Sequence, residues 1–239
     1  MDCMKKLPEY PDNFFDIAVV DPPYGIGEDG RRKRANNGRR AVKQTNGTVL
    51  HCRGDYDARG WDDEPPPQEY FDQLFRVSRH QIIWGINNFT TCRDLPIGPG
   101  RIFWDKCQEG SDFSDGELAY CSLHSSVRKF VYMWRGMMQG KSIRHGWIQQ
   151  GNKKLNEKRF HPTQKPVALY RWITDEYIQP GWKVLDTHVG SASSLIAYED
   201  HGIFYHGYEL DPAYYQESSD RLAAAVRRFS SRLPFPDCR

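Results

Sequence analysis

Residues 183–193, KVLDTHVGSAS, place a short apolar strand directly before a turn of small residues. The strand covers residues 183–186, and the turn leads into a predicted helix that ends near Gly202. A second strand is expected at residues 204–209, and Asp211 with Pro212 caps a last predicted helix. Strands and helices in this order predict parallel strands joined by crossover helices.

The same alternation extends toward the N-terminus. Residues 16–21, DIAVVD, form an apolar run rich in β-branched side chains, which is typical of a buried strand. Prolines 65–67 and Pro166 each open a predicted helix. Further strands are expected at residues 81–84, 101–104, 117–123 and 129–134. We therefore predict one α/β domain over residues 1–239, with a mostly parallel central sheet flanked by helices.

Composition narrows the class of protein. The chain has 239 residues, of which 27% are charged and 13% aromatic, and the aromatic content is too high for a disordered chain. No apolar run approaches the ~18 residues of a membrane span, and the N-terminal residues lack the apolar core of a signal peptide. The six cysteines have neither Cys-x-x-Cys nor finger-like spacing. We expect a soluble cytoplasmic protein with free thiols, no membrane contact and no metal.

The net charge of +2 hides two strongly basic segments. Residues 28–54 hold eight basic and two acidic residues, and residues 131–160 hold seven basic and one acidic residue. Two basic loops on an acidic body indicate a face that contacts a polyanion, although solvated loops would give the same charges. We treat the basic loop 28–60 and the aperiodic insertion 135–160 as candidates for that face.

The segment Asp21-Pro22-Pro23-Tyr24 follows the first strand. The two prolines fix the backbone and remove two N–H donors, so an acidic acceptor, a carbonyl acceptor and an aromatic face stand close together. This set complements a planar ring that carries an exocyclic amino group. The alternative is a proline turn whose tyrosine covers the sheet edge.

The turn at residues 187–193 is suited to a small charged ligand, because backbone N–H groups gather before a helix. Glu209 ends the next strand and can hold the two hydroxyls of a ribose. The turn lacks the full Gly-x-Gly-x-x-Gly pattern, so from these residues alone either a nucleoside cofactor or plain packing is consistent.

Taken together and in this order, the segments resemble the β-type amino-group DNA methyltransferases, in particular small phage- or prophage-type N6-adenine methylases. The matching segments are 20–25 (VDPPYG), 161–166 (HPTQKP), 185–194 (LDTHVGSASS) and 207–211 (GYELD). The chain departs from the family at His188, where most members have Phe, and at Ala192, where many have a second glycine. The resemblance implies a Rossmann-like methyltransferase fold with circularly permuted motif order.

The resemblance further implies S-adenosylmethionine as methyl donor and the N6 amino group of adenine in DNA as acceptor. Asp21 and the Pro22 carbonyl would accept the amino hydrogens, and Tyr24 would stack on a base flipped from the duplex. The implied catalytic residues are Asp21, Pro22, Pro23 and Tyr24. The implied cofactor-binding residues are Asp2, Asp21, Thr163, Lys165, Asp186, His188, Gly190, Ser191 and Glu209.

Some of these roles have alternatives. Lys165 would also fit as a solvated lysine at a helix start, His188 fits loop packing better than a catalytic base, and Ala192 is expected to narrow the loop. The expected DNA contacts are Arg31, Arg32, Lys33, Arg34, Arg39, Arg40, Lys141 and Arg144. Double-stranded DNA is the expected partner, and a homodimer is left open. The competing functions are a cytosine-N4 methyltransferase and a non-catalytic DNA- or nucleoside-binding protein on the same fold.

Overall fold

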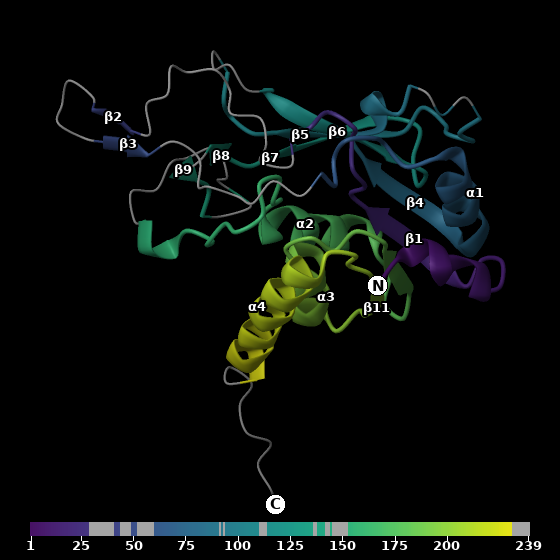
Figure 1. Cartoon of the computed structure of the whole chain (residues 1–239). Coiled ribbons are helices and arrows are strands. Elements are labelled where there is room, and N and C mark those ends of the chain that lie inside the picture. Colours follow the sequence, from purple (N-terminus) through teal and green to yellow (C-terminus); the bar gives the residue numbers. More distant parts are fainter. Residues whose placement is uncertain are drawn as a thin grey trace, which may run out of the picture.

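The computed structural model describes residues 1–28, 60–90, 92, 94–109, 114–135, 138–141, 144 and 153–230, together with the backbone of 41–43 and 49–51. Its centre is a seven-stranded sheet in the order β11-β10-β1-β4-β6-β5-β7 (Figure 1). The strands are β1 (Phe15–Val20), β4 (Ser78–Trp84), β5 (Arg101–Asp105), β6 (Gly116–Cys121), β7 (Val127–Val131), β10 (Lys183–Asp186) and β11 (Phe204–Gly207). Within this sheet β6 is antiparallel to both of its neighbours, and the other pairs are parallel.

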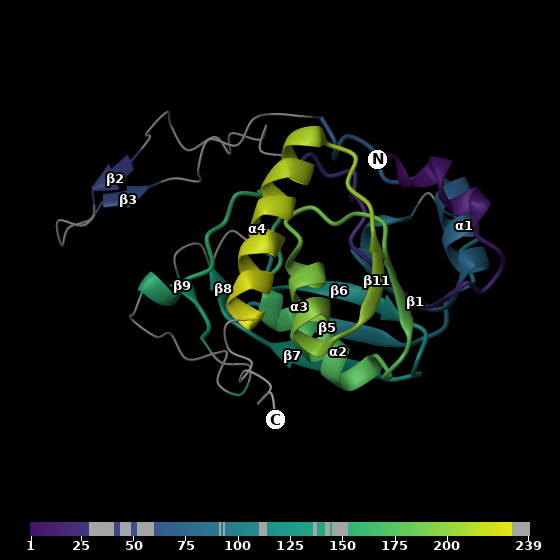
Figure 2. The same cartoon turned by 90° about the horizontal axis from the view of Figure 1, so that it is seen from below.

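Helices cover both faces of the sheet. Helices α2 (Val167–Tyr177), α3 (Ser193–His201) and α4 (Pro212–Ser230) lie on one face, and α1 (Gln68–Val77) lies on the other with short 3₁₀ helices at Cys3–Lys5 and Leu7–Glu9 (Figure 2). Pro67 and Pro166 are the N-caps of α1 and α2, as the proline positions predicted. Gly202 ends α3 in a left-handed conformation, with φ +65°, which glycine adopts at little cost.

Strand β1 is buried on both of its faces. Ile17 and Val19 belong to the core under α2 and α3, whereas Ala18 and Val20 belong to the core under α1. An apolar run without polar alternation is what a central parallel strand needs, because helices cover it on both sides. The predicted α/β class and the mostly parallel, helix-flanked sheet are therefore confirmed.

The strand predicted at residues 129–134 is divided in the structure. Strand β7 ends at Val131, and Trp134 begins β8 (Trp134–Arg135), which pairs with β9 (Met138–Gln139). The indole of Trp134 is buried and donates to the Gln164 carbonyl at 2.8 Å, so this side chain leaves the line of the main sheet. The strand predicted at 117–123 likewise ends at Cys121.

The two segments expected as loops contain short regular elements. Strands β2 (Ala41–Lys43) and β3 (Val49–His51) pair antiparallel within 28–60, and a 3₁₀ turn occupies Lys153–Leu155. In the described residues no helix is long and apolar enough to cross a membrane, and no group of three acidic, histidine or cysteine side chains could hold a metal ion. Cys3, Cys92, Cys107 and Cys121 are free, and Cys52 and Cys238 lie outside the described residues.

This topology fixes where the predicted motifs meet. Strands β1, β10 and β11 are adjacent and parallel, so their carboxyl ends lie at one edge of the sheet. The segment at 21–24 follows β1, the turn at 187–192 follows β10, and Glu209 follows β11. Neighbouring strands are about 4.8 Å apart, so the ends of β1 and β11 are separated by about 10 Å.

Candidate active site

The segment after β1 is held in place by Asp62. Oδ1 of this buried carboxylate accepts the backbone N–H groups of Tyr24 at 2.7 Å and Gly25 at 2.9 Å, and Oδ2 accepts that of Glu28 at 2.7 Å. Gly25 has φ +71°, and a Cβ there would stand 2.5 Å from the ring of Pro65. Asp62 therefore fixes the path of the chain at the end of the Asp-Pro-Pro-Tyr motif.

The ring of Tyr24 lies over Gly85, which directly follows β4. A Cβ at residue 85 would stand 2.0 Å from a ring carbon of Tyr24, and Gly85 has φ +72°. The ring also makes an edge contact with Phe89, with centroids 6.1 Å apart. No larger side chain fits at residue 85 while Tyr24 keeps this position.

Asp21, Tyr24 and Lys165 are joined by polar contacts. The Lys165 Nζ atom lies 2.5 Å from Asp21 Oδ1 and 3.0 Å from Tyr24 Oη, and the Tyr24 hydroxyl donates to the same Asp21 oxygen at 2.7 Å. Among the described residues no group donates to Asp21 Oδ2. One oxygen of the carboxylate is thus anchored, and the other remains for a ligand.

Two further charged residues complete this cluster. Glu117 at the start of β6 lies with Oε2 2.9 Å from Lys165 Nζ, and its Oε1 pairs with Lys106. The Lys165 side chain is 3% exposed, so the ammonium is almost fully removed from water. We call Asp21, Tyr24, Lys106, Glu117 and Lys165 the charge cluster.

Burial and charge act together on the titration of the cluster. Burial raises the pKa of Asp21, and Lys165 opposes that rise. Burial alone would raise the pKa of Glu117, but Lys106 and Lys165 hold it well below its usual range. Burial disfavours the charge of Lys165, yet the two carboxylates outweigh this and raise its pKa. Lys165 is therefore a stable cation in the folded protein.

The turn after β10 is organised by two carboxylates. Glu209 accepts the N–H of Gly190 at 2.8 Å through Oε2 and that of Asp211 at 2.9 Å through Oε1. The buried Asp186 accepts the N–H of His188 at 3.0 Å and the hydroxyl of Ser194 at 2.5 Å. Burial raises the pKa of Asp186 to about 7 and also raises that of Glu209.

Ala192 adopts the backbone conformation that glycine favours. Its φ is +59° and it is the N-cap of α3 without a side-chain hydrogen bond. A left-handed conformation costs a non-glycine residue about 1–2 kcal/mol. Ala192 therefore takes up a conformation suited to glycine, and the alanine is accommodated by backbone strain.

His188 packs against α1. Its ring makes an edge contact with Tyr70, with centroids 5.4 Å apart, and Nδ1 lies 2.9 Å from the Thr187 hydroxyl. Burial lowers the pKa of His188 to about 4, so the ring is neutral at pH 7. These contacts favour a packing role for His188 in the turn over a role as a general acid or base.

The remaining predicted cofactor residues lie around the same turn. Asp2 caps the first 3₁₀ helix by accepting the N–H of Met4 at 2.9 Å, and the Met1 ammonium donates to the Glu209 carbonyl. The Thr163 hydroxyl lies 3.2 Å from Nδ1 of His161, whose ring stands against Gly190. Lys165 differs, because its polar contacts are with the charge cluster and its ammonium lies 5.5 Å from the centroid of the Trp84 ring, and its cofactor role stays a prediction.

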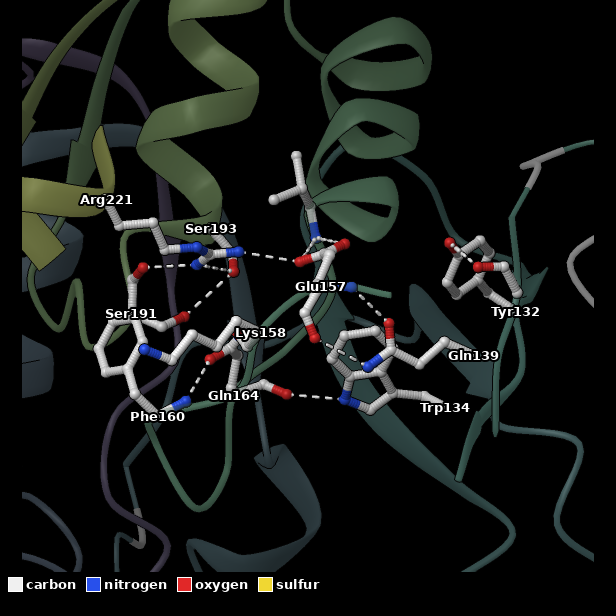
Figure 3. Close-up of polar contacts among 12 residues, drawn as sticks. Tyr132, Trp134, Gln139, Glu157, Lys158, Phe160, Gln164, Ser191, Ser193 and Arg221 are labelled. Carbon is white, nitrogen blue, oxygen red and sulfur yellow. Dashed lines mark hydrogen bonds and ion pairs between the residues drawn. The ribbon is translucent and has the colours of Figure 1, made fainter. Parts of the chain in front are cut away.

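Arg221 of α4 ties the turn to the insertion (Figure 3). Its guanidinium donates to the Ser191 carbonyl at 2.6 Å, the Ser193 hydroxyl at 2.9 Å and Glu157 Oε2 at 2.9 Å. Glu157 also accepts the N–H of Val167 at the start of α2, at 3.1 Å. The backbone of Glu157 exchanges two hydrogen bonds with the amide of Gln139 in β9, so one residue connects the insertion, α2 and α4.

Most of the predicted DNA contacts cannot be placed. Arg31, Arg32, Lys33, Arg34, Arg39 and Arg40 lie outside the described residues. Lys141 is half-buried and donates to the Asn156 side chain, and Arg144 is exposed in a turn.

The sequence analysis did not find Asp62, Glu117, Lys106, Glu157 or Arg221. Lys106 and Glu117 stand at the end of β5 and the start of β6, where Trp104 pairs with Glu117. The sequence signal that could have indicated these two residues is their charge at the ends of predicted strands. The end of β5 and the start of antiparallel β6 lie at the same edge of the sheet as the end of β1. For Asp62, Glu157 and Arg221 the sequence holds no comparable signal.

Comparison with known proteins gives the class of this fold. The computed structure matches the solved methylase TTHA0409 of Thermus thermophilus with a TM-score of 0.53 and 18% identity, over 95% of this chain and 93% of that one. It matches the M1.HpyAVI–SAM complex with a TM-score of 0.50 and 15% identity, over 92% and 96%. The cytosine-N4-specific PvuII methyltransferase matches with a TM-score of 0.50 and 11% identity, over 97% and 91%. The chain has the Rossmann-like methyltransferase fold that was predicted.

Sequence comparison gives the family. A family of DNA methylases, the N6/N4 methyltransferases, matches residues 101–220, which is half of the chain. The Escherichia coli K12 protein YubD, a methylase by name, is 26% identical over 228 residues, 95% of this chain and 89% of its own. The type II methyltransferase M.HinfI of Haemophilus influenzae is 23% identical over 92% of this chain and 66% of its own. This chain belongs to the DNA methylase family.

Proposed function

We propose that this chain transfers a methyl group from S-adenosylmethionine to the N6 amino group of adenine in DNA. The observation that carries the proposal is how the two carboxylate oxygens of Asp21 are hydrogen-bonded. Lys165 and Tyr24 anchor Oδ1, and Oδ2, to which none of the described residues donates, is the oxygen proposed to accept an amino hydrogen, at the edge where the Glu209 turn also lies. An exocyclic amino group is the substrate feature that such an acceptor fits.

The donor-binding residues fit the chemistry of S-adenosylmethionine. Each Glu209 oxygen holds one backbone N–H and keeps a lone pair, so the carboxylate can also take two ribose hydroxyls. Gly190 and Ser191 would hold the amino-acid end, with Asp186 ordering the turn. Bound S-adenosylmethionine would supply the methyl group from its cationic sulfur, and the sulfur would keep the electron pair of the broken carbon–sulfur bond.

The protein's own part is to orient and activate the amino group. The lone pair of an adenine amino nitrogen is delocalised into the ring, which makes it a poor nucleophile. Asp21 Oδ2 and the Pro22 carbonyl would each accept one amino hydrogen and direct the lone pair at the methyl carbon. After the nitrogen–carbon bond forms, the surplus proton on nitrogen passes to the Asp21 carboxylate.

Tyr24 and the basic segments would handle the DNA. Tyr24 borders the acceptor site, and its ring would offer a face to a base taken out of the stack, at a cost of a few kcal/mol. The basic loop 28–60, with Arg31 to Arg40, and Lys141 and Arg144 of the insertion would contact phosphates of duplex DNA. A phage-type origin, a homodimer and a cytoplasmic location remain predictions.

The second candidate is methylation of the N4 amino group of cytosine. Cytosine presents the same kind of amino group to Asp21, and the cytosine-N4-specific PvuII methyltransferase shares the fold. The choice of adenine rests on the aspartate at the first motif position, because serine is commoner there in cytosine enzymes.

Product analysis tests the proposal. Mixed-sequence duplex DNA is incubated with the chain and methyl-labelled S-adenosylmethionine and is then digested to nucleosides. We expect label in N6-methyldeoxyadenosine, and an Asp21→Asn variant supplies the matched control. Label only in N4-methyldeoxycytidine would establish the second candidate, and DNA without label in the presence of bound donor would contradict both.

A further inference from the structure

The charge cluster contains two residues outside every motif that points to methyl transfer. Lys106 follows β5, Glu117 is the second residue of β6, and β6 is the antiparallel strand of the main sheet. Lys106 pairs with Glu117 Oε1, and Glu117 Oε2 lies 2.9 Å from Lys165 and 3.2 Å from the Tyr24 hydroxyl, which follows β1. Side chains from the segments after β1 and β5, from β6 and from the 161–166 segment are thus linked in one chain of polar contacts.

The hydrogen bonds of Lys165 are fully used within the cluster. An ammonium has three N–H donors, and Nζ of Lys165 has three acceptors: Asp21 Oδ1, Glu117 Oε2 and Tyr24 Oη. Glu117 and Asp21 therefore hold Lys165 from two sides. Without Glu117 the ammonium would keep a single anionic contact and could turn toward a ligand.

The cluster also balances its charges. Asp21 and Glu117 are opposed by Lys165 and Lys106, and the four side chains are all at most 20% exposed. Lys106 is needed because Glu117 on its own would leave a buried surplus of negative charge beside Asp21. A neutral cluster next to a cationic sulfur neither attracts nor repels it strongly.

We propose that Glu117, supported by Lys106, is a positioning residue that fixes Lys165 and thereby the reactive orientation of Asp21. The inference rests on the proposed methyl transfer, since Asp21 is the acceptor of the amino hydrogens. Glu117 itself touches neither donor nor base. Its effect passes through Lys165 and the Tyr24 hydroxyl.

The two neighbours of Asp21 act on its titration in opposite directions. Lys165 lowers the pKa of Asp21, and Glu117 raises it. Tyr170 of α2, Tyr70 of α1 and Asp186 of β10 also interact electrostatically with Asp21, and none of them is changed in any variant. Removing the charge of Glu117 should move the acid limb of the rate to lower pH, whereas removing that of Lys165 should move it to higher pH.

The experiment compares Glu117→Gln, Lys165→Met and the double variant Lys106→Met/Glu117→Gln with the wild type. Lys129→Met is the control, because Lys129 of β7 forms an ion pair with Asp105 of β5 at 2.7 Å in the same sheet, outside the charge cluster and with a lysine side chain that is 56% exposed. Single-turnover rates on DNA are measured across pH at saturating donor, and donor affinity is measured separately by calorimetry. Lysine acylation read by mass spectrometry reports the accessibility of Lys165 without reference to activity.

We expect Glu117→Gln to slow the single turnover by about 10–100-fold, the effect of displacing a reacting group by a fraction of an ångström to an ångström. Donor affinity should stay within about threefold, Lys165 should become more reactive to acylation, and the acid limbs should shift in the opposite directions given above. The double variant removes a neutral pair and so avoids a surplus buried charge. It should remain slow, because Lys165 still lacks its second anchor.

Three results would overturn the inference: a wild-type rate and pH profile in Glu117→Gln, a wild-type rate in the double variant, or the same loss of rate in Lys129→Met. A wild-type chain that binds donor and transfers no methyl group would instead count against the proposed function. Acylation of Lys165 still reads the positioning by Glu117 in that case, so the two failures are distinguishable.

Discussion

Arg221 and Glu157 lie 64 residues apart in the sequence, and their side chains meet at 2.9 Å between Nη2 and Oε2. The same guanidinium holds the Ser191 carbonyl of the turn that is proposed to bind the donor. The basic insertion and the donor turn are therefore connected through one side chain.

Arg221→Met should weaken donor binding by about 10–100-fold, because a charged hydrogen bond to a loop carbonyl contributes about 1.5–3 kcal/mol. The rate at saturating donor should change little, since Arg221 touches no reacting group. Calorimetric donor titration measures the first effect and single-turnover kinetics the second. Asp200→Asn, which breaks the Arg171–Asp200 pair between α2 and α3, is the control. Equal losses of donor affinity in Arg221→Met and Asp200→Asn would mean that Arg221 contributes only to the stability of the fold.

Glu209→Gln should raise the donor Kd while sparing the rate at saturating donor. The amide can still accept one N–H but loses the charge and one acceptor for the ribose hydroxyls. Because burial raises the pKa of Glu209, donor binding to the wild type should weaken as pH falls through a range above the ordinary glutamate value. Glu199→Gln, which alters an exposed acceptor of the Tyr205 hydroxyl, is the control. An unchanged Kd for Glu209→Gln would refute the donor placement.

Asp21→Asn should lower turnover by at least ~100-fold with donor affinity nearly intact, because it replaces an acceptor that acts in the transition state by a donor. In the wild type the rate should fall with decreasing pH at a point above the usual aspartate range, since burial raises the pKa of Asp21 and only the ionised carboxylate can take the proton. Rates and donor affinity are measured on the same preparation. Near-normal turnover of the variant would show that another group accepts the amino hydrogens.

Asp186→Asn should stabilise the donor-free protein at pH 8. The pKa of Asp186 is about 7 in the fold against an ordinary value of 3.8. Between these values the folded state keeps a proton that the unfolded state releases, so the contribution of Asp186 to stability is lost as pH rises to about 7. The free energy of unfolding is measured with denaturant at pH 5 and pH 8. The difference between variant and wild type should be about 1–3 kcal/mol more in favour of the variant at pH 8 than at pH 5. A constant difference between the two pH values would contradict the shifted pKa.

Replacing Arg31, Arg32, Lys33 and Arg34 by serine should weaken binding to every DNA sequence. Log affinity falls with log salt, and each lost phosphate contact makes this negative slope shallower by about 0.9. The slope of the variant should therefore be shallower by about 2–4 units. Donor affinity and base preference should persist, because phosphate contacts carry no sequence information. Binding titrations at several salt concentrations give the slope. If it stays unchanged, residues 131–160 carry the contact.

The sequence predicts the main elements of the fold because each depends on short-range signals. The β-branched run at 16–21 is β1, Pro67 and Pro166 directly precede helices, and the strand at 183–186 matches β10. The strand ends predicted at residues 123, 134 and 209 were wrong, because β6, β7 and β11 end at Cys121, Val131 and Gly207. Trp134 leaves the sheet because its indole binds the Gln164 carbonyl across 30 residues.

Of the candidate site, the sequence indicates the strand-end motifs and misses their supports. Asp21, Tyr24 and Glu209 follow strands whose ends must meet in a parallel sheet. Glu117 and Lys106 join them only because β6 runs antiparallel between β4 and β5, an order that periodicity does not encode. Asp62 and Arg221 act on backbone groups 30 or more residues away, and no local pattern marks such partners.

The pairing of β1 with β10 joins residues as far apart as Ile17 and Val184. Synthesis begins at the N-terminus, so β1 exists long before its neighbour on that side. Contacts of such high sequence separation form late and slow the folding of a chain. Strand β1 can pair with β4 early but gains its second neighbour, β10, only with the last third of the polypeptide, so the turn beside Asp21 is completed last. A nascent chain that stops before residue 183 contains Asp21 and its partners Tyr24 and Lys165 but lacks β10, the turn that follows it and Glu209.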